Sequence, residues 1–217
     1  MFEMRQLSCT NTVRPVDPFA LLQGVFAVVI DMKTIILEGI ATSGKSTIIN
    51  KVEDAVKEVA LLKVVPEEQS LMAILDNTDL KVSLEYLNRL LSEVYGKEYS
   101  LVIFDRLHLT HAFRTNSNIE DYANIEEQLL THSSEIIFLK VQESAIADRV
   151  KQASEHRDPS WKEYLVTKGK DFDEIAGYYI KQQKRQIELL EQSRIPYRIF
   201  DMTEHDYASI LEYILPV

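Results

Sequence analysis

The chain has 217 residues, enough for one domain of ordinary size and too few for two comfortable ones. Lys and Arg number 24 against 34 Asp and Glu, a formal net charge of −10. An acidic chain repels phosphate over long range, so we expect neither general nucleic-acid binding nor binding to an anionic membrane. The single cysteine, Cys9, excludes an internal disulfide and a cysteine-based zinc cage, which suits a reducing compartment.

Residues 1–31 are predicted to form an N-terminal extension of unknown role. They contain an apolar stretch over 19–30, which Gln23 and Gly24 interrupt and which is too short to span a bilayer. No small-residue cleavage pattern follows this stretch, so we expect a cytoplasmic protein rather than a secreted one. The folded domain is expected to cover residues 32–217.

Beyond residue 32, short apolar runs alternate with longer segments of helical period. The runs are rich in Ile, Val and Leu and mostly lack polar alternation, which is typical of strands buried on both faces of a parallel sheet. They fall at 34–37, 61–65, 101–104, 136–141 and 197–200. This alternation predicts a three-layer α/β fold in which helices flank a five-stranded parallel sheet.

Three helices are predicted from periodicity and start signals. Residues 80–95 carry leucines at intervals of three or four, and residues 171–191 open with Asp171 and Glu174 in capping-box spacing. The last helix is expected to begin at Thr203, three residues before Asp206.

A phosphate-binding loop is predicted between the first strand and the helix after it. The sequence there reads G-x-x-x-x-G-K-S, the pattern in which backbone N–H groups wrap a phosphate and the helix start adds positive charge. The Lys ammonium can reach the β- and γ-phosphates of ATP, and the Ser hydroxyl can bind Mg²⁺. The predicted nucleotide-binding residues are Gly39, Ile40, Ala41, Thr42, Ser43, Gly44, Lys45, Ser46 and Thr47.

A second candidate lies at the end of the run 101–104, where Asp105 and Arg106 follow directly. In this architecture the carboxyl end of a strand lies beside the phosphate loop. Asp105 is therefore predicted to hold Mg²⁺ together with Ser46, and Arg106 to bind phosphate oxygens. The chain has neither the guanine-reading Asn-Lys-x-Asp motif of switch GTPases nor the signature of transporter ATPases.

These motifs resemble the P-loop superfamily of deoxynucleoside kinases and thymidylate kinases. Glu38 before the phosphate loop fits both branches, and Val-Val-Pro-Glu, which ends at Glu67, is similar to deoxynucleoside kinases. The Asp105-Arg106 pair is closer to thymidylate kinases. The resemblance implies a P-loop kinase fold with a helical lid at about 149–160, ATP and Mg²⁺ as ligands, and a homodimer as one possible assembly.

Glu67 bears on the acceptor of the phosphoryl group. Phosphorylation of a neutral alcohol removes a proton from the attacking oxygen, so a nearby carboxylate helps as general base. A monophosphate attacks with an anionic oxygen and needs cations instead, and thymidylate kinases normally place an Arg beside this Glu, where the chain has Pro66. We therefore predict Glu67 as the base and a hydroxyl as the acceptor. A solvated acid at the end of a strand is the alternative.

The resemblance also implies further site residues. Arg149 and Arg157 are predicted to close over the transferring phosphoryl group, with a solvated helix end as the alternative. Tyr86, Arg89 and Phe113 are predicted to bind the acceptor, although a core aromatic or a surface arginine explains each equally well. The five histidines show no zinc-ligand pattern and are interpreted as ordinary polar residues.

The function predicted from the sequence is transfer of the γ-phosphoryl of ATP-Mg²⁺ to a hydroxyl of a nucleoside or a similar small molecule. Two alternatives remain open at this point. Asp105-Arg106 and the lid favour a nucleoside monophosphate kinase, and a catalytically inactive nucleotide-binding regulatory protein is the alternative from another class. The short segment between Glu67 and Asp105 also leaves a sugar or another small alcohol open as acceptor.

Overall fold

The computed structural model describes residues 32–56, 61–157 and 159–215. The predicted N-terminal extension, residues 1–31, lies outside the described residues, as does residue 158 of the predicted lid. The described residues belong to one compact unit, which begins at Asp31.

Five parallel strands form one sheet in the order β2-β3-β1-β4-β5. Their bounds are β1 Lys33–Glu38, β2 Leu62–Val65, β3 Leu101–Asp105, β4 Ser134–Lys140 and β5 Tyr197–Asp201. The prediction of a parallel five-stranded sheet is confirmed, and each predicted run overlaps one strand. Only the inner strands β1, β3 and β4 are buried along most of their length, while the edge strand β5 is largely exposed.

Helices fill the connections between the strands and cover both faces of the sheet, as an all-parallel sheet requires. The helices are α1 Lys45–Val56, α2 Glu67–Ser70, α3 Leu80–Tyr95, α4 His108–Thr115, α5 Ala123–Leu130, α6 Glu143–His156, α7 Pro159–Val166, α8 Phe172–Gln192 and α9 Tyr207–Ile214. Two 3₁₀ turns, η1 Met72–Ile74 and η2 Ile119–Tyr122, complete the described elements.

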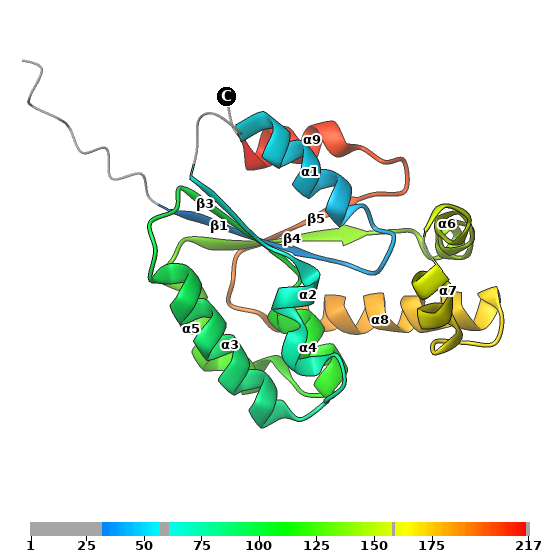
Figure 1. Cartoon of the computed structure of the whole chain (residues 1–217), viewed down its shortest axis with the longest axis horizontal. Coiled ribbons are helices and arrows are strands. Elements are labelled where there is room, and N and C mark those ends of the chain that lie inside the picture. Colours follow the sequence, from blue (N-terminus) through cyan, green and yellow to red (C-terminus); the bar gives the residue numbers. More distant parts are fainter. Residues whose placement is uncertain (1–31, 57–60, 158, 216–217) are drawn as a thin grey trace, which may run out of the picture. The chain divides into compact units, whose positions relative to one another are not determined.

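The sheet separates two hydrophobic cores. Figure 1 shows α1 and α9 on one face and α3, α4 and α5 on the other, with α6 and α7 beyond the carboxyl end of the strands. Alternate residues of each inner strand enter opposite cores, so Ile35 and Ile36 are neighbours in sequence but pack on different faces. This layering brings the loops after β1, β2 and β3 to one edge of the sheet, where ligands gather in such folds.

The helix predictions hold except at one start. The predicted helix over 80–95 matches α3, and the Asp171 side chain caps α8 by accepting from the Glu174 backbone N–H at 2.9 Å. The last helix begins after Asp206, which accepts from the Ser209 N–H, so the prediction of Thr203 as its start was wrong. The Thr203 N–H instead donates to the Asp201 carboxylate at 2.8 Å, in a turn that precedes the helix.

Across the described part of the chain, no helix combines the length and apolar character needed to cross a membrane.

Candidate active site

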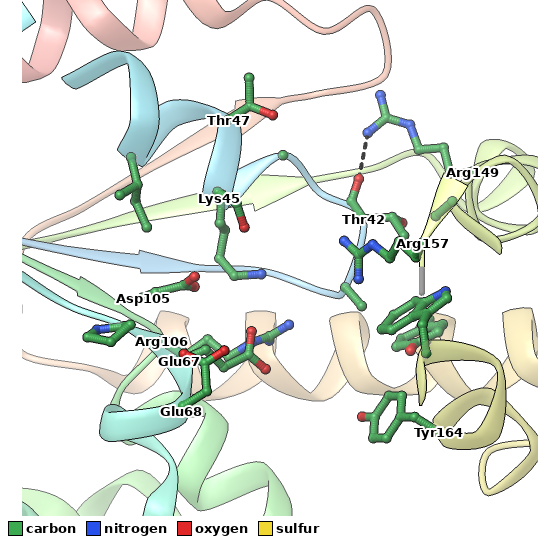
Figure 2. A pocket seen from close by; sticks show the side chains of 18 of the residues that line it. Thr42, Lys45, Thr47, Glu67, Glu68, Asp105, Arg106, Arg149, Arg157 and Tyr164 are labelled. Atoms are coloured by element: carbon green, nitrogen blue, oxygen red, sulfur yellow. Dashed lines mark hydrogen bonds and ion pairs between the residues drawn. The ribbon is translucent and has the colours of Figure 1, made fainter. Parts of the chain in front are cut away.

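One cleft of about 1330 Å³ lies at the carboxyl edge of the sheet. It is lined by the predicted phosphate loop, the start of α2, the end of β3, and the helices α6, α7 and α8. Among the predicted site residues it collects Ala41, Thr42, Gly44, Lys45, Ser46, Thr47, Glu67, Asp105, Arg106, Arg149 and Arg157. Figure 2 shows Lys45, Asp105 and Glu67 turned into this space, with Arg157 and Tyr164 on the side of the lid.

The phosphate loop has the backbone that its two glycines were expected to permit. Gly39 and Gly44 have φ angles of 138° and 102°, a region that side chains strongly disfavour. A Cβ at Gly39 would lie 2.6 Å from the Leu139 carbonyl oxygen, so the tight approach to β4 also requires glycine. The loop thus turns back over the end of the sheet and presents its backbone to the cleft.

Two cations converge on this loop. The Lys45 Nζ lies 3.4 Å from the Gly39 carbonyl oxygen and 3.2 Å from that of Ile40, and Arg106 donates to Gly39 at 2.6 Å. Burial, followed by the nearby Arg106 charge, lowers the pKa of Lys45 to about 8. An anion bound in the loop would raise this pKa again, because its negative charge favours the ammonium form.

Arg106 connects the loop to the predicted base. It follows β3 in a left-handed conformation, with φ of 64°, which is strained for a side-chain-bearing residue. Its Nε lies 3.1 Å from a Glu67 carboxylate oxygen, and only 4% of Arg106 is exposed. Burial opposes the charge of Arg106, but Glu67 and Asp105 outweigh this and raise its pKa.

Glu67 begins α2 and is partly exposed on the wall of the cleft. Burial disfavours its ionised form, but the charges of Arg106 and Lys45 dominate and lower the pKa of Glu67 to about 2. The carboxylate is therefore ionised and a weak base across the physiological range. Glu67 also lines the cleft, so it lies beside the space that a bound acceptor would occupy.

Asp105 and Ser46, the two residues predicted to hold Mg²⁺, line the same cleft. Asp105 is only 6% exposed, and its Oδ1 has no hydrogen-bond partner among the described residues. Burial raises the pKa of Asp105 although Lys45 and Arg106 oppose this, so a further cation would stabilise the carboxylate. Ser46 is exposed in the first turn of α1 and lines the same cleft. A carboxylate and a hydroxyl beside a phosphate site fit a hard oxygen-seeking cation.

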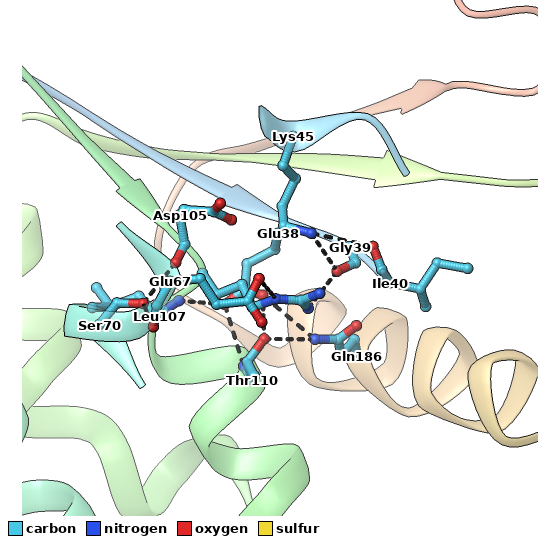
Figure 3. A network of polar contacts seen from close by, with 11 residues as sticks. Glu38, Gly39, Ile40, Lys45, Glu67, Ser70, Asp105, Leu107, Thr110 and Gln186 are labelled. Carbon is cyan, nitrogen blue, oxygen red and sulfur yellow. Dashed lines mark hydrogen bonds and ion pairs between the residues drawn. The ribbon is translucent and has the colours of Figure 1, made fainter. Parts of the chain in front are cut away.

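Glu38, which leads into the phosphate loop, takes a structural role that its position in the sequence does not reveal. Its buried carboxylate accepts from the backbone N–H groups of Leu107 and Thr110, from the Thr110 hydroxyl and from the Gln186 amide (Figure 3). Leu107, the N-cap of α4, contributes no side-chain cap. Glu38 thus supplies the missing cap and ties β1, α4 and α8 together behind the loop.

The two lid arginines occupy different environments. Arg149 is 7% exposed and donates to the Thr42 carbonyl at 3.3 Å and the Thr203 carbonyl at 3.0 Å. It therefore links the phosphate loop to the loop after β5, as Figure 2 shows for Thr42. Arg157 is exposed at the end of α6, and its guanidinium lies 4.1 Å from the ring centre of Trp161.

The predicted acceptor residues do not meet in the cleft. Tyr86 is 9% exposed, its hydroxyl donates to the Gln69 carbonyl, and Arg89 packs over its ring at 5.5 Å. Phe113 packs edge-on against Tyr178 at 6.1 Å, behind the wall of the cleft. None of the three is among the residues that line this cleft.

Arg114 was missed in the sequence but lines the cleft. Its guanidinium donates to the Ile74 carbonyl at 3.3 Å, and its charge contributes to the lowered pKa of Glu67. Arg114 lies near the C-terminal end of α4, and no local pattern in the sequence sets the direction of its side chain. The cleft also contains the α7 aromatics Trp161 and Tyr164, whose direction only the packing of α7 decides.

No protein-family model matches the chain, and no curated protein matches its sequence. Its fold is similar to that of the YorR protein from Bacillus subtilis in complex with phosphorylated GDP, with a TM-score of 0.56 and 20% identity, over 83% of this chain and 92% of that one. It is also similar to deoxyadenosine kinase from M. mycoides with bound dCTP, with a TM-score of 0.50 and 21% identity, over 83% and 96%. A gluconokinase from Sinorhizobium meliloti gives a TM-score of 0.50 and 13% identity, over 85% and 90%. The chain therefore has the fold of the P-loop kinases.

Proposed function

We propose that the protein is an ATP-dependent phosphotransferase that moves the γ-phosphoryl group to a hydroxyl of a nucleoside or a similar small molecule. The observation that carries this proposal is the Glu67 carboxylate, which lines the cleft of the phosphate loop and pairs with Arg106 at 3.1 Å. The fold supports a kinase, and the YorR and deoxyadenosine kinase structures contain nucleotides.

In this mechanism the chain positions two substrates and balances charge. The phosphate loop and Lys45 hold the β- and γ-phosphates, and Arg157 approaches them from the lid. Asp105 and Ser46 would hold Mg²⁺, whose charge would neutralise the phosphate oxygens.

The acceptor oxygen forms the new P–O bond while the bond from the γ-phosphorus to the bridging oxygen breaks and releases ADP. Glu67 takes the hydroxyl proton. Because the transition state of phosphoryl transfer is loose, this proton leaves late and a weak base suffices. Arg106 keeps the Glu67 carboxylate oriented and balances charge that develops on the phosphoryl group.

The test replaces Glu67 by Gln and uses Glu68→Gln as its matched control, since Arg106 pairs with Glu67. Glu67→Gln should lower kcat by at least about a hundredfold, the usual contribution of a general base, while ATP affinity stays near normal. Glu68→Gln should retain most of the activity. ADP release with a saturating nucleoside measures both, and an unchanged kcat in Glu67→Gln would refute the role of Glu67.

A nucleoside monophosphate kinase is the second candidate, and Arg114 favours it. This arginine adds a cation to the cleft near Glu67, where an anionic acceptor could bind. A panel of nucleosides, nucleoside monophosphates and gluconate separates the candidates by ADP release. Under the first proposal nucleosides react fastest and Arg114→Gln retains their turnover. Faster turnover of monophosphates, lost in Arg114→Gln, would support the second candidate, and ATP binding without any transfer would contradict both.

A further inference from the structure

The segment that carries Glu67 cannot hold its own position. It is α2, a single helical turn of four residues, and its N-cap residue Pro66 offers no side-chain cap. A helix this short is unstable by itself, because the conformational entropy lost in forming the first turn outweighs the energy of its few hydrogen bonds. The direction of the Glu67 carboxylate must therefore come from groups outside α2.

Three buried side chains fix the end of this turn: Ser70 of α2 itself, which bonds to β3, and one side chain each from α3 and α4. The Ser70 hydroxyl donates to the Asp105 carbonyl at 2.6 Å, which ties α2 to the end of β3. The Tyr86 hydroxyl, from α3, donates to the Gln69 carbonyl. The ring of His111, from α4, places its Nε2 2.9 Å from the Ser70 carbonyl oxygen.

The contact of His111 defines its protonation. A carbonyl oxygen only accepts, so Nε2 carries the hydrogen, and Nδ1 then accepts from the Ser83 hydroxyl at 2.7 Å. The Ser83 oxygen lies 3.0 Å from the Tyr122 hydroxyl, so the chain of hydrogen bonds continues into the core. Burial lowers the pKa of His111 to about 4, which agrees with a neutral ring.

We propose that His111 is a positioning residue for the phosphoryl transfer proposed above. It holds the last carbonyl of α2 against α4, and the turn in turn directs Glu67 toward Arg106. Both His111 and Ser83 are fully buried and lie outside the lining of the cleft, so they act on the site through α2 and not by touching a ligand. This inference rests on the proposed role of Glu67.

Two amide substitutions at His111 distinguish the effect of its Nε2–H donor from the effect of its side-chain volume. In His111→Gln the side-chain nitrogen can reach the place of Nε2 and donate to Ser70, whereas the shorter Asn amide reaches only the place of Nδ1. His111→Asn should therefore lower kcat by up to about a hundredfold, the cost of a displaced reacting group, with the KM for ATP within about threefold of wild type. His111→Gln should recover most of kcat. His132→Asn serves as the control, because His132 stacks on Tyr95 and does not line the cleft.

Amide hydrogen exchange tests the same link without any activity. The N–H groups of Gln69, Ser70 and Leu71 close the turn of α2. In His111→Asn they should exchange roughly tenfold faster than in His111→Gln, as expected for one lost buried hydrogen bond. If His111→Asn fails to fold, Ser83→Ala replaces it in the test. This variant keeps the imidazole but removes the hydroxyl that donates to Nδ1, so it should raise the exchange rates at α2 and lower kcat, as expected for His111→Asn.

The outcomes are distinguishable. Equal exchange at α2 in the Asn and Gln variants would overturn the positioning role, as would equal loss of kcat in both. If the wild-type protein transfers no phosphoryl group to any acceptor, the proposed function fails, and hydrogen exchange alone decides whether His111 positions α2.

Discussion

At the scale of single residues, the charge of Lys45 depends on pH near the physiological range. Its ammonium is buried against the carbonyls of Gly39 and Ile40, next to Arg106, and its pKa is lowered to about 8. Bound phosphate favours the charged ammonium and so raises this pKa. A triphosphate bound in the predicted phosphate loop would therefore take up protons near pH 8, and its affinity would fall as the pH rises above that value.

We predict that the affinity for a non-hydrolysable ATP analogue decreases between pH 7.5 and 9.5, by at most about tenfold per pH unit. In Lys45→Arg the guanidinium stays charged over this range, so its affinity, although different, should not change with pH. Calorimetric titrations of both proteins provide the measurement. Parallel pH dependence in the two proteins would show that another group is responsible.

Two glycines offer a matched pair of substitutions. Gly39→Ala meets both a φ of 138° and the Leu139 carbonyl, so it should destabilise the protein by more than about 1 kcal/mol and abolish nucleotide binding. Gly177 lies inside α8, and no atom lies within 4 Å of the place that a Cβ would take, so Gly177→Ala should stabilise the protein by about 0.5–1 kcal/mol. Urea unfolding compares them, and a loss of stability in Gly177→Ala would contradict the account of α8.

At the scale of elements, Glu38 joins a strand to two helices. Each of its carboxylate oxygens accepts two hydrogen bonds, and the donors belong to Leu107, Thr110 and Gln186. An amide in its place keeps one accepting oxygen and turns a donor toward the others. The connection between the phosphate loop and α4 therefore depends on a full carboxylate.

Accordingly, we expect Glu38→Gln to cost about 2 kcal/mol of the free energy of unfolding, the value of hydrogen bonds to a charged group. Glu143→Gln is the comparison: its ion pair with Lys184 at 3.1 Å is half exposed, so its loss should cost less than about 1 kcal/mol. Chemical denaturation measures both. Equal costs would mean that burial of the Glu38 network adds nothing.

At the scale of the whole molecule, the domain boundary near residue 32 stays a prediction, and the described residues belong to a compact unit that begins at Asp31. We predict that a chain starting at Met32 folds with a Tm within about 2 °C of the full-length protein, since its core is complete. A chain that starts at Leu37 loses the fully buried Ile35 and Ile36 and should not fold. Thermal unfolding followed by circular dichroism compares the three, and a large drop for the Met32 chain would give the extension a structural role.

The features that the sequence predicted well are local ones. The phosphate loop is a contiguous motif whose glycines are required by the backbone, and each buried strand is a contiguous run of apolar residues. The error in the predicted start of the last helix shows that even local signals can be ambiguous. Thr203 and Asp206 both offer capping oxygens, and the turn closed on Asp201 decides between them.

What the sequence alone determined is therefore the class of fold and the backbone conformation of the glycine loop after β1, because both depend on neighbouring residues. Only the tertiary structure decided that Glu67 pairs with Arg106, that Arg114 faces the cleft and that Tyr86 does not. These outcomes depend on the rotation of each helix about its axis when it packs on the sheet. That rotation is set by contacts between residues far apart in the chain, which no single segment encodes.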